Sequence, residues 1–457
     1  MVQNKNNKNQ RMLNILFALT IVMIPFNSLP YMKNIFGELS GEGAFYPLFI
    51  ISSIVAIRML YNGKIRIRKN KVFIVLFILL IWITISGMIN MEFISKNYTK
   101  GRSGINKYIM QLLVYVFGII TTYISYYVVK NCNISLEKIR RYIIISFYIV
   151  GFYSIFEIMR FLNINIGTNL ISKIDCIIRN TTSGYVFGEY DRLRSVCAES
   201  SWFSMYAAFV FPWIFTCLFD KKNKIKYVFI CGYFIVMILF TKSRSGYVII
   251  AIELLIMSIL ILKSKNKKVN KSIIIGVILF GSILLVPIIN YTNAKNGINV
   301  VKVVQSLRDR DNLSNIARYG SQKASLNMGL HNPIFGVGLG QYGFYMPKYI
   351  DEEYYNKSWE IREWVNPQEN TPWPPVHSLY LRIIGELGIV GFIIWIYLCG
   401  YILKNLYKIY KNSNETLLLA LFVSYVGTLL SFFNIDSFRF LPMWIIAGLY
   451  IKIADDY

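Results

Sequence analysis

Charged residues are scarce in this sequence. Asp, Glu, Lys and Arg make up only 16% of its 457 residues, against roughly 25% in an average soluble domain. Hydrophobic residues make up 55%, and the mean hydropathy is +0.45. This composition excludes an ordinary soluble globular protein, and it is typical of an all-α integral membrane protein.

Residues that bind metals are scarce as well. The chain has only two histidines, and its six cysteines contain no C-x-x-C pair, which excludes the common zinc sites. One D-x-D pair, Asp309 and Asp311, is flanked by two arginines that would repel a divalent cation. We therefore predict no metal site and no cofactor. Cys176 and Cys197 share one predicted outer loop, where they either form a disulfide or remain two free thiols.

Long apolar segments, by contrast, are abundant. A transmembrane helix needs about 20 mostly apolar residues, and the first segment lacks a small-x-small cleavage site, so we expect it to be retained. We predict about 12 transmembrane helices within a single polytopic domain, 1–457, at residues 12–31, 43–60, 72–90, 108–129, 142–162, 201–219, 227–241, 246–262, 273–290, 377–403, 416–434 and 438–454.

The net charge of +25 follows the predicted topology. Lys and Arg gather at the N-terminus and in every second loop, namely 61–71, 130–141, 220–226, 263–272 and 404–415. Positive residues mark cytoplasmic loops, so we predict that both termini are cytoplasmic and that no nucleic acid is bound. Segment 91–107 is an exception, because it should lie outside and yet carries four cations.

Two long extracytoplasmic loops are predicted, at 163–200 and at 291–376, the latter between spans 9 and 10. Long loops in compact proteins are usually functional or disordered. The larger loop contains a predicted helix, 315–330, which is stopped by Pro333. It also contains GLGQYG at 338–343, which matches the G-x-G-x-x-G pattern of dinucleotide sites. That site needs a preceding strand and a following helix, and neither is indicated here.

Several charged residues lie within the predicted spans, where they need partners. Glu157 is three residues from Arg160 and Arg382 is four residues from Glu386, spacings that allow pairing on one helix face. Glu253 has no local partner, so it must face another helix or a wet cavity.

Other polar residues gather at the predicted outer boundary. Guanidinium groups that converge there either bind phosphate oxygens of a lipid-linked diphosphate or extend singly to lipid headgroups. These residues, with nearby hydroxyl and carboxylate groups, are Arg192, Arg194, Glu199, Lys242, Ser243, Arg244, Ser245 and Arg318.

His377 opens the tenth predicted span. It either sits in the interfacial belt with Trp364 and Trp373 or acts as a general base, since imidazole titrates near neutral pH. Glu386 lies on the opposite helix face, so Tyr380 or an acid of the outer loop is expected to orient the ring.

Four segments in order resemble the O-antigen polymerase and O-antigen ligase family of bacterial membrane glycosyltransferases. They are RLRSVCAESSWFSMY, SRSGYVIIAIELL, ARYGSQKASLNMGLHNPIFGVGLGQYGFY and HSLYLRIIGELGIVGFIIW, and the resemblance covers roughly residues 190 to 400.

The resemblance implies a glycosyltransferase-C-like helical bundle with its active site between bundle and outer loop, a metal-independent mechanism, and an undecaprenyl diphosphate-linked oligosaccharide as donor. Arg244 and Arg318 would bind the diphosphate, and His377 would activate the acceptor hydroxyl. Further substrate-binding positions are implied at Arg192 or Arg194, which compete for one family position, and at Glu199, Ser243, Ser245, Gly338 and Gly340.

From this resemblance we predict a polymerase that joins lipid-linked repeat units into an O-antigen or capsule at the outer face of the bacterial cytoplasmic membrane. The alternatives are a ligase that transfers glycan to a lipid A core and, from a different class, a flippase for the lipid-linked oligosaccharide. Partners would be the bilayer, the lipid-linked substrate and a chain-length regulator.

Overall fold

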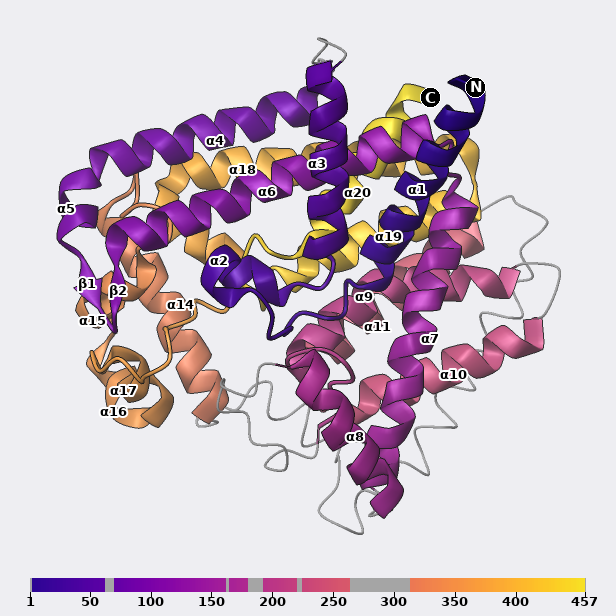
Figure 1. The fold of residues 1–457 in the computed structure, drawn as a ribbon. Coiled ribbons are helices and arrows are strands. Elements are labelled where there is room, and N and C mark those ends of the chain that lie inside the picture. The colour runs from indigo at the N-terminus through magenta and orange to yellow at the C-terminus, as the bar shows by residue number, and fades with distance from the viewer. Residues whose placement is uncertain are drawn as a thin grey trace.

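The computed structural model describes residues 2–61, 70–161, 164–179, 192–219, 224–263 and 313–456. These ranges are mostly helical, as predicted (Figure 1). Their two strands, β1 (Tyr98–Thr99) and β2 (Arg102–Ser103), form a small antiparallel hairpin in which Tyr98 lies opposite Ser103.

Long helices match all the predicted spans except 273–290, which lies outside the described residues. Six of them, α4, α6, α7, α9 with its 3-10 extension, α11 and α18, are long and apolar enough to cross a membrane, whereas the total of twelve spans stays a prediction. The long helices are α1 (Val2–Val22), α3 (Phe45–Tyr61), α4 (Lys71–Ile89), α6 (Gly104–Asn131), α7 (Leu136–Phe161), α9 (Ser200–Thr216), α10 (Lys224–Phe240), α11 (Arg244–Lys263), α18 (Leu379–Ser413), α19 (Thr416–Ser431) and α20 (Leu441–Asp456).

Helix ends differ from the predicted limits for local reasons. α1 ends at Val22 rather than at residue 31, because Pro25 follows and disfavours helical backbone before it. α18 extends ten residues beyond its predicted end and stops at Asn414, which adopts a left-handed conformation with φ of 53°.

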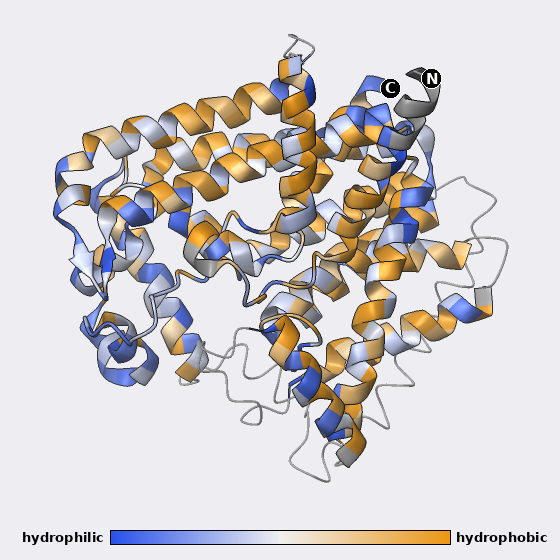
Figure 2. Cartoon of the chain, in the orientation of Figure 1, coloured by the Kyte–Doolittle hydropathy of each residue, from blue (hydrophilic) through white to orange (hydrophobic). Residues whose placement is uncertain are grey.

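Small residues let the apolar helices approach closely. A side chain at Gly118 of α6 would collide with the buried ring of Trp444 in α20, and one at Gly448 would meet the backbone of α6. Such contacts are typical of helices that associate in lipid, where packing replaces hydrophobic burial as the driving force. Figure 2 shows the hydrophobic character of these helices and the polar character of the segments at their ends.

The C-terminal part of the predicted outer loop forms a small helical layer of its own. Its helices are α14 (Leu313–His331), α15 (Tyr342–Tyr349), α16 (Glu352–Lys357) and α17 (Trp359–Val365). They enclose a separate core around Met328, Met346 and Ile361. α14 packs against the start of α18, where Gly385 lies directly over Ser325.

Four shorter helices complete the described N-terminal part of the chain. They are α2 (Lys33–Phe36), the 3-10 helix η1 (Gly37–Gly41), α5 (Met91–Lys96) and α8 (Asn165–Ile178).

The two chain ends lie at the same end of α6. Gln10 donates to the carbonyl of Asn131, the last residue of α6, and Tyr126 in its final turn donates to Asp455. At the other end, Gln341 donates to the carbonyl of the first residue of α6. A helix of 28 residues is roughly 40 Å long, so the outer-loop layer and the termini are separated by about a membrane thickness (Figure 1).

Candidate functional site

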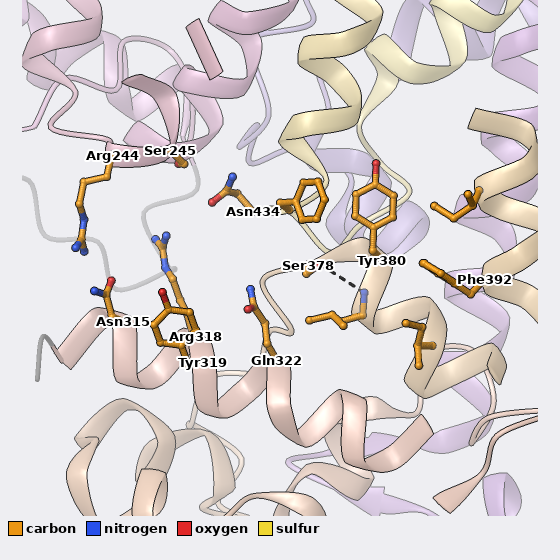
Figure 3. Close-up of a pocket in the computed structure, with 14 residues that line it drawn as sticks. Arg244, Ser245, Asn315, Arg318, Tyr319, Gln322, Ser378, Tyr380, Phe392 and Asn434 are labelled. Carbon is orange, nitrogen blue, oxygen red and sulfur yellow. Dashed lines mark hydrogen bonds between the residues drawn. The ribbon is translucent and has the colours of Figure 1, made fainter. Parts of the chain in front are cut away.

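A cavity of about 680 Å³ lies where the start of α11, α14, the start of α18 and the end of α19 meet. We call it the arginine pocket (Figure 3). Its lining is polar at one end and apolar at the other, and it consists of Arg244, Ser245, Asn315, Arg318, Tyr319, Gln322, Ser378, Tyr380, Leu381, Ile384, Phe392, Ile396, Phe433 and Asn434.

The polar end of the pocket concentrates positive charge. Figure 3 shows Arg244 reaching from α11 toward Asn315 and Arg318, which project from α14. Burial and repulsion from the guanidinium groups of Arg244 and Arg192 lower the pKa of Arg318, while Glu199 acts in the opposite direction. Cations that repel one another in this way would be stabilised by a bound anion.

Arg192 is held beside these arginines by backbone contacts. Its Nε donates to the carbonyl of Thr241 at 3.0 Å and its Nη2 to that of Lys242 at 3.4 Å. The next residue, Leu193, donates to the carbonyl of Phe240 at 2.8 Å. The segment before α9 is therefore fixed to the turn between α10 and α11, which brings Arg192 to the site.

The two serines of that turn have different positions. Ser243 is buried and caps α11, since its carbonyl accepts from Tyr247 N at 3.1 Å and its hydroxyl from Gly246 N at 3.4 Å. Ser245 lines the arginine pocket. Only Ser245 of this pair is therefore placed to contact a ligand there, whereas Ser243 shapes the turn.

His377 lies just before α18, with φ of 59°, a conformation rare for a residue with a side chain. Gln322, which lines the arginine pocket, donates to its carbonyl at 3.2 Å, and Trp364 packs against the ring at 5.6 Å between centroids. Burial and the nearby Arg318 lower the pKa of His377 to about 4, against an opposing effect of Asp436. The imidazole is therefore neutral at pH 7, the form that accepts a proton.

Asp436 is the acid near His377, and sequence reasoning missed it. It belongs to the turn between α19 and α20, and its Oδ2 accepts a hydrogen bond from Val376 N at 2.5 Å. Of the two expected partners of the ring, Tyr380 instead donates its hydroxyl to the carbonyl of Leu429 at 2.9 Å, and an acid of the outer loop stays a prediction. No motif links residues 377 and 436, so only the fold brings them together.

Arg194 is buried and does not line the arginine pocket, so its implied contact with substrate stays a prediction. Its Nη2 lies 3.4 Å from Asp175 Oδ2, and Arg179 binds the other carboxylate oxygen at 2.8 Å. Glu157, expected to pair with Arg160, accepts from Ser195 N at 2.7 Å. This cluster joins α7, α8 and the segment before α9. Of the two competing arginines, Arg192 is the one whose charge acts on Arg318.

Glu199, implied as another part of the site, is exposed and accepts a hydrogen bond from Ser201 at 3.2 Å. Its negative charge acts on Arg318 electrostatically and raises the pKa of that guanidinium. Glu253 packs against Gly427 of α19, as expected for an acid that faces another helix.

The glycines of GLGQYG form a cradle for a carboxylate of the chain itself. Gly338 and Gly340 have φ of 98° and 79°, and Gly340 N and Tyr342 N donate to the two oxygens of Glu386 at 2.8 and 3.0 Å. Glu386 also binds Arg382 at 2.9 Å, the intrahelical pair expected from their spacing. Neither glycine lines the arginine pocket. The loop fastens the outer layer to α18, and the implied role of the two glycines in substrate binding stays a prediction.

α18 is interrupted where this loop contacts it. Gly388 has φ of 70°, so the helical hydrogen bonds break. The carbonyls of residues 385 and 386 accept from Val337 N and Gly338 N, and that of Leu387 accepts from Trp82 Nε1. These replacement partners satisfy the freed backbone groups, as is required at membrane depth.

The two cysteines of the predicted outer loop do not form a disulfide. Cys176 is exposed and Cys197 is buried, and both are free thiols. Among the described residues, no group of three His, Cys, Asp or Glu side chains could hold a metal ion. The D-x-D pair, Asp309 and Asp311, lies outside the described residues.

One known protein family matches part of the chain. Residues 229–396 match the model of the O-antigen ligase family, a range that includes Arg244, Arg318 and His377. The chain contains an O-antigen ligase family domain. The chain is thus similar to that family over 168 of its 457 residues, and six of its described helices are long and apolar enough to cross a membrane, which indicates a multi-pass membrane protein. Arg192, Arg194 and Glu199 lie outside the matched range, and no curated protein matches the chain.

Proposed function

We propose that this O-antigen ligase family protein is a polymerase. It joins undecaprenyl diphosphate-linked oligosaccharide units into a surface polysaccharide, O-antigen or capsule, at the outer face of the bacterial cytoplasmic membrane. The observation that supports a lipid diphosphate-linked donor is the two-sided arginine pocket. Its cations suit a diphosphate, and its apolar end, along Ile384, Phe392 and Ile396, suits a prenyl chain.

In this mechanism the neutral imidazole of His377 takes the proton from an acceptor hydroxyl. The hydroxyl oxygen attacks the anomeric carbon of the donor, and the bond from that carbon to the diphosphate breaks. The electron pair leaves with undecaprenyl diphosphate, whose charge Arg244 and Arg318 stabilise, assisted by Arg192. Fixed guanidinium groups supply the stabilisation that a divalent cation gives elsewhere, so the reaction proceeds without a metal.

A ligase is the second candidate, because the matching family is described as O-antigen ligase. A carrier also deserves a test, since interrupted helices such as α18 are common in transporters. However, the arginine pocket lies beside the first turns of α18 and next to the outer-loop layer, rather than in the middle of the bundle.

Purified protein in vesicles with lipid-linked repeat units distinguishes the three functions. A polymerase releases undecaprenyl diphosphate and makes a ladder of longer glycans. A ligase releases it only after lipid A core is added, and transfers the glycan once. A carrier moves the substrate across the vesicle membrane and releases no diphosphate.

The proposed orientation is tested by thiol labelling in a cysteine-free variant. Asn356→Cys on α16 should react with an impermeant reagent added outside cells, whereas Glu137→Cys, near the opposite end of the bundle, should react only after lysis. Both positions are exposed, so accessibility of the side chain does not limit the reaction. The reverse pattern would contradict a cytoplasmic location of the termini and an outer location of the site.

A further inference from the structure

A second cavity, of about 140 Å³, lies on the other side of the segment that carries His377. We call it the mixed-charge pocket. Pro374, Pro375 and Val376 line it, whereas Ser378 lines the arginine pocket. The remaining lining residues are Glu38, Lys107, Gln111, Gly340, Tyr342, Trp373, Arg382, Glu386, Asp436, Ser437 and Arg439.

The charges of this pocket balance. Three carboxylates, from Glu38, Glu386 and Asp436, face three cations, from Lys107, Arg382 and Arg439. A pocket without excess positive charge is a poor site for a diphosphate or a free phosphate. It can, however, hold a neutral ligand that both donates and accepts hydrogen bonds, such as a sugar ring.

A network of hydrogen bonds holds these side chains in place. Lys107 Nζ lies 2.9 Å from one oxygen of Glu38, and Gln111 donates to the other at 3.1 Å. Arg382 donates to Gln111 and Glu386, both at 2.9 Å. Polar groups fixed in this way are prepared for a ligand before it arrives, which lowers the entropic cost of binding.

Two polar groups of the pocket retain hydrogen-bonding capacity. Asp436 accepts from Val376 through Oδ2, and within the described part of the chain its Oδ1 accepts no hydrogen bond. The ammonium of Lys107 contacts Glu38 and lies 4.7 Å from the centre of the Trp373 ring, and it has three donors in all. An acceptor and a donor thus remain for a hydroxylated ligand.

The two pockets lie on either side of the segment that contains His377, although His377 itself lines neither of them. Asp436 lines the mixed-charge pocket and Arg318 lines the arginine pocket, and both act electrostatically on the imidazole. A ligand in the mixed-charge pocket would therefore lie across the 374–378 segment from a diphosphate held by Arg318. A two-substrate transfer with one general base requires the acceptor hydroxyl to reach both that base and the reacting carbon of the donor.

We propose that the mixed-charge pocket binds the terminal sugar of the acceptor glycan, with Lys107 and Asp436 as its ligand-binding residues. This inference rests on the proposed function, since it assigns the second substrate of the same reaction. The hydroxyl to be glycosylated points toward His377, and the rest of the acceptor chain extends out of the pocket.

Lys107→Gln tests the proposal, because it removes the cation but keeps a donor of similar length. The donor is the lipid-linked repeat unit, and the acceptor is the same repeat unit freed from its lipid by mild acid. We expect at least a tenfold rise in the KM for the free acceptor, with unchanged binding of the donor. Lys107→Arg should restore much of the acceptor affinity. Asp436→Asn, which keeps the shape of the side chain, should also raise the acceptor KM.

Lys323→Gln is the matched control, since it removes a lysine from an exposed ion pair with Asp351 outside both pockets. It should leave both substrates unaffected. An acceptor KM that stays constant in Lys107→Gln and Asp436→Asn would overturn the proposal, and so would an equal loss of donor and acceptor binding, which indicates a structural role.

Thermal unfolding separates this proposal from the proposed function. The free repeat unit should raise the unfolding midpoint of the unaltered protein, because a ligand stabilises the state that binds it, and should do so less in Lys107→Gln. If no transfer occurs, the proposed function fails, but this shift still supports sugar binding. If the midpoint does not move in the unaltered protein, the pocket assignment is wrong.

Discussion

The arginine pocket and the mixed-charge pocket each contain two arginines, but in opposite circumstances. In the arginine pocket, burial and the neighbouring arginines lower the pKa of Arg318. In the mixed-charge pocket, Arg382 is bound to Glu386, to Gln111 and to the carbonyl of Asp436. The comparison teaches that an arginine indicates an anion site only where the fold has not already supplied its anion.

The largest effect is expected at the boundary between the pockets. His377→Ala removes the proposed general base, which contributes about a hundred- to ten-thousand-fold to rate. Since the base acts on the acceptor, binding of the lipid-linked donor should survive. Transfer rates and donor binding measured on the same purified sample check this. Parental rates in His377→Ala would show that the histidine only packs against Trp364.

Replacement of an arginine in the arginine pocket should weaken binding of the lipid-linked donor and lower the rate of transfer. Arg318→Ala should lower the rate by on the order of a hundred- to a thousand-fold, as for other groups that stabilise developing charge. Arg318→Lys should restore little, because a point charge lacks the two-pronged guanidinium geometry. Full activity in Arg318→Lys would mean that net charge alone is recognised.

Removal of the paired Arg382 should instead affect stability. Arg382→Ala leaves the carboxylate of Glu386, which is 1% exposed, without its cation. Breaking a buried pair in this way costs about 3 to 5 kcal/mol. Thermal unfolding and protein level in the membrane measure the effect. Normal stability together with lost donor binding would show that Arg382 binds the donor, as is proposed for Arg244 and Arg318. That result would contradict the difference drawn between the two pockets.

The pH dependence of kcat/KM measures how strongly Arg318 acts on His377. The pKa of His377 is lowered to about 4, so the base stays neutral and active from pH 7 down to about pH 5 and is lost as pH falls through 4. Arg318→Gln removes a charge that lowers this pKa, and the acidic limb should move to higher pH. Arg362→Gln, an exposed arginine on α17, is the control and should leave the limb in place.

The smallest expected effect is that of metal removal. If fixed arginines stabilise the leaving diphosphate, a chelator should leave the rate unchanged. A complete loss of activity that magnesium restores would show that a cation takes part, and would direct attention to Asp309 and Asp311.

The cations of segment 91–107 illustrate a limit of sequence interpretation. These four cations conflict with the positive-inside pattern, and the structure shows specific partners for two of them. Lys100 is 7% exposed and donates to the carbonyls of Glu363 and Pro372 in the outer loop, and Lys107 binds Glu38. Lys100 thus fastens the outer loop to the hairpin between α5 and α6, and Lys107 fastens α6 to η1. A charge count cannot distinguish a lysine that faces the cytoplasm from one that holds a loop.

The glycine-rich loop shows a second limit, because the group that it binds could not be found from the sequence. No strand precedes the motif within the described residues 313–337, but a helix that the sequence did not indicate, α15, follows it. The anion that the loop does bind, Glu386, lies about 45 residues away in the chain, within an apparently ordinary apolar span. Only the break of α18 at Gly388 opens the backbone that this loop contacts.

The sequence by itself determined the membrane class, the order of the apolar helices, and the residue types that suit a diphosphate and a proton acceptor, because hydropathy and side-chain chemistry are local properties. It also supplied the resemblance to the O-antigen ligase family, whose model matches residues 229–396, since each motif around Arg244, Arg318 and His377 is contiguous in the chain. The tertiary structure alone decided which charges are neutralised. Arg194 and Arg382 are paired with acids, whereas Arg318 lies among cations and Asp436 is brought to His377. Electrostatic interactions depend on distance and burial in the folded chain, and neither quantity is encoded by spacing along the sequence.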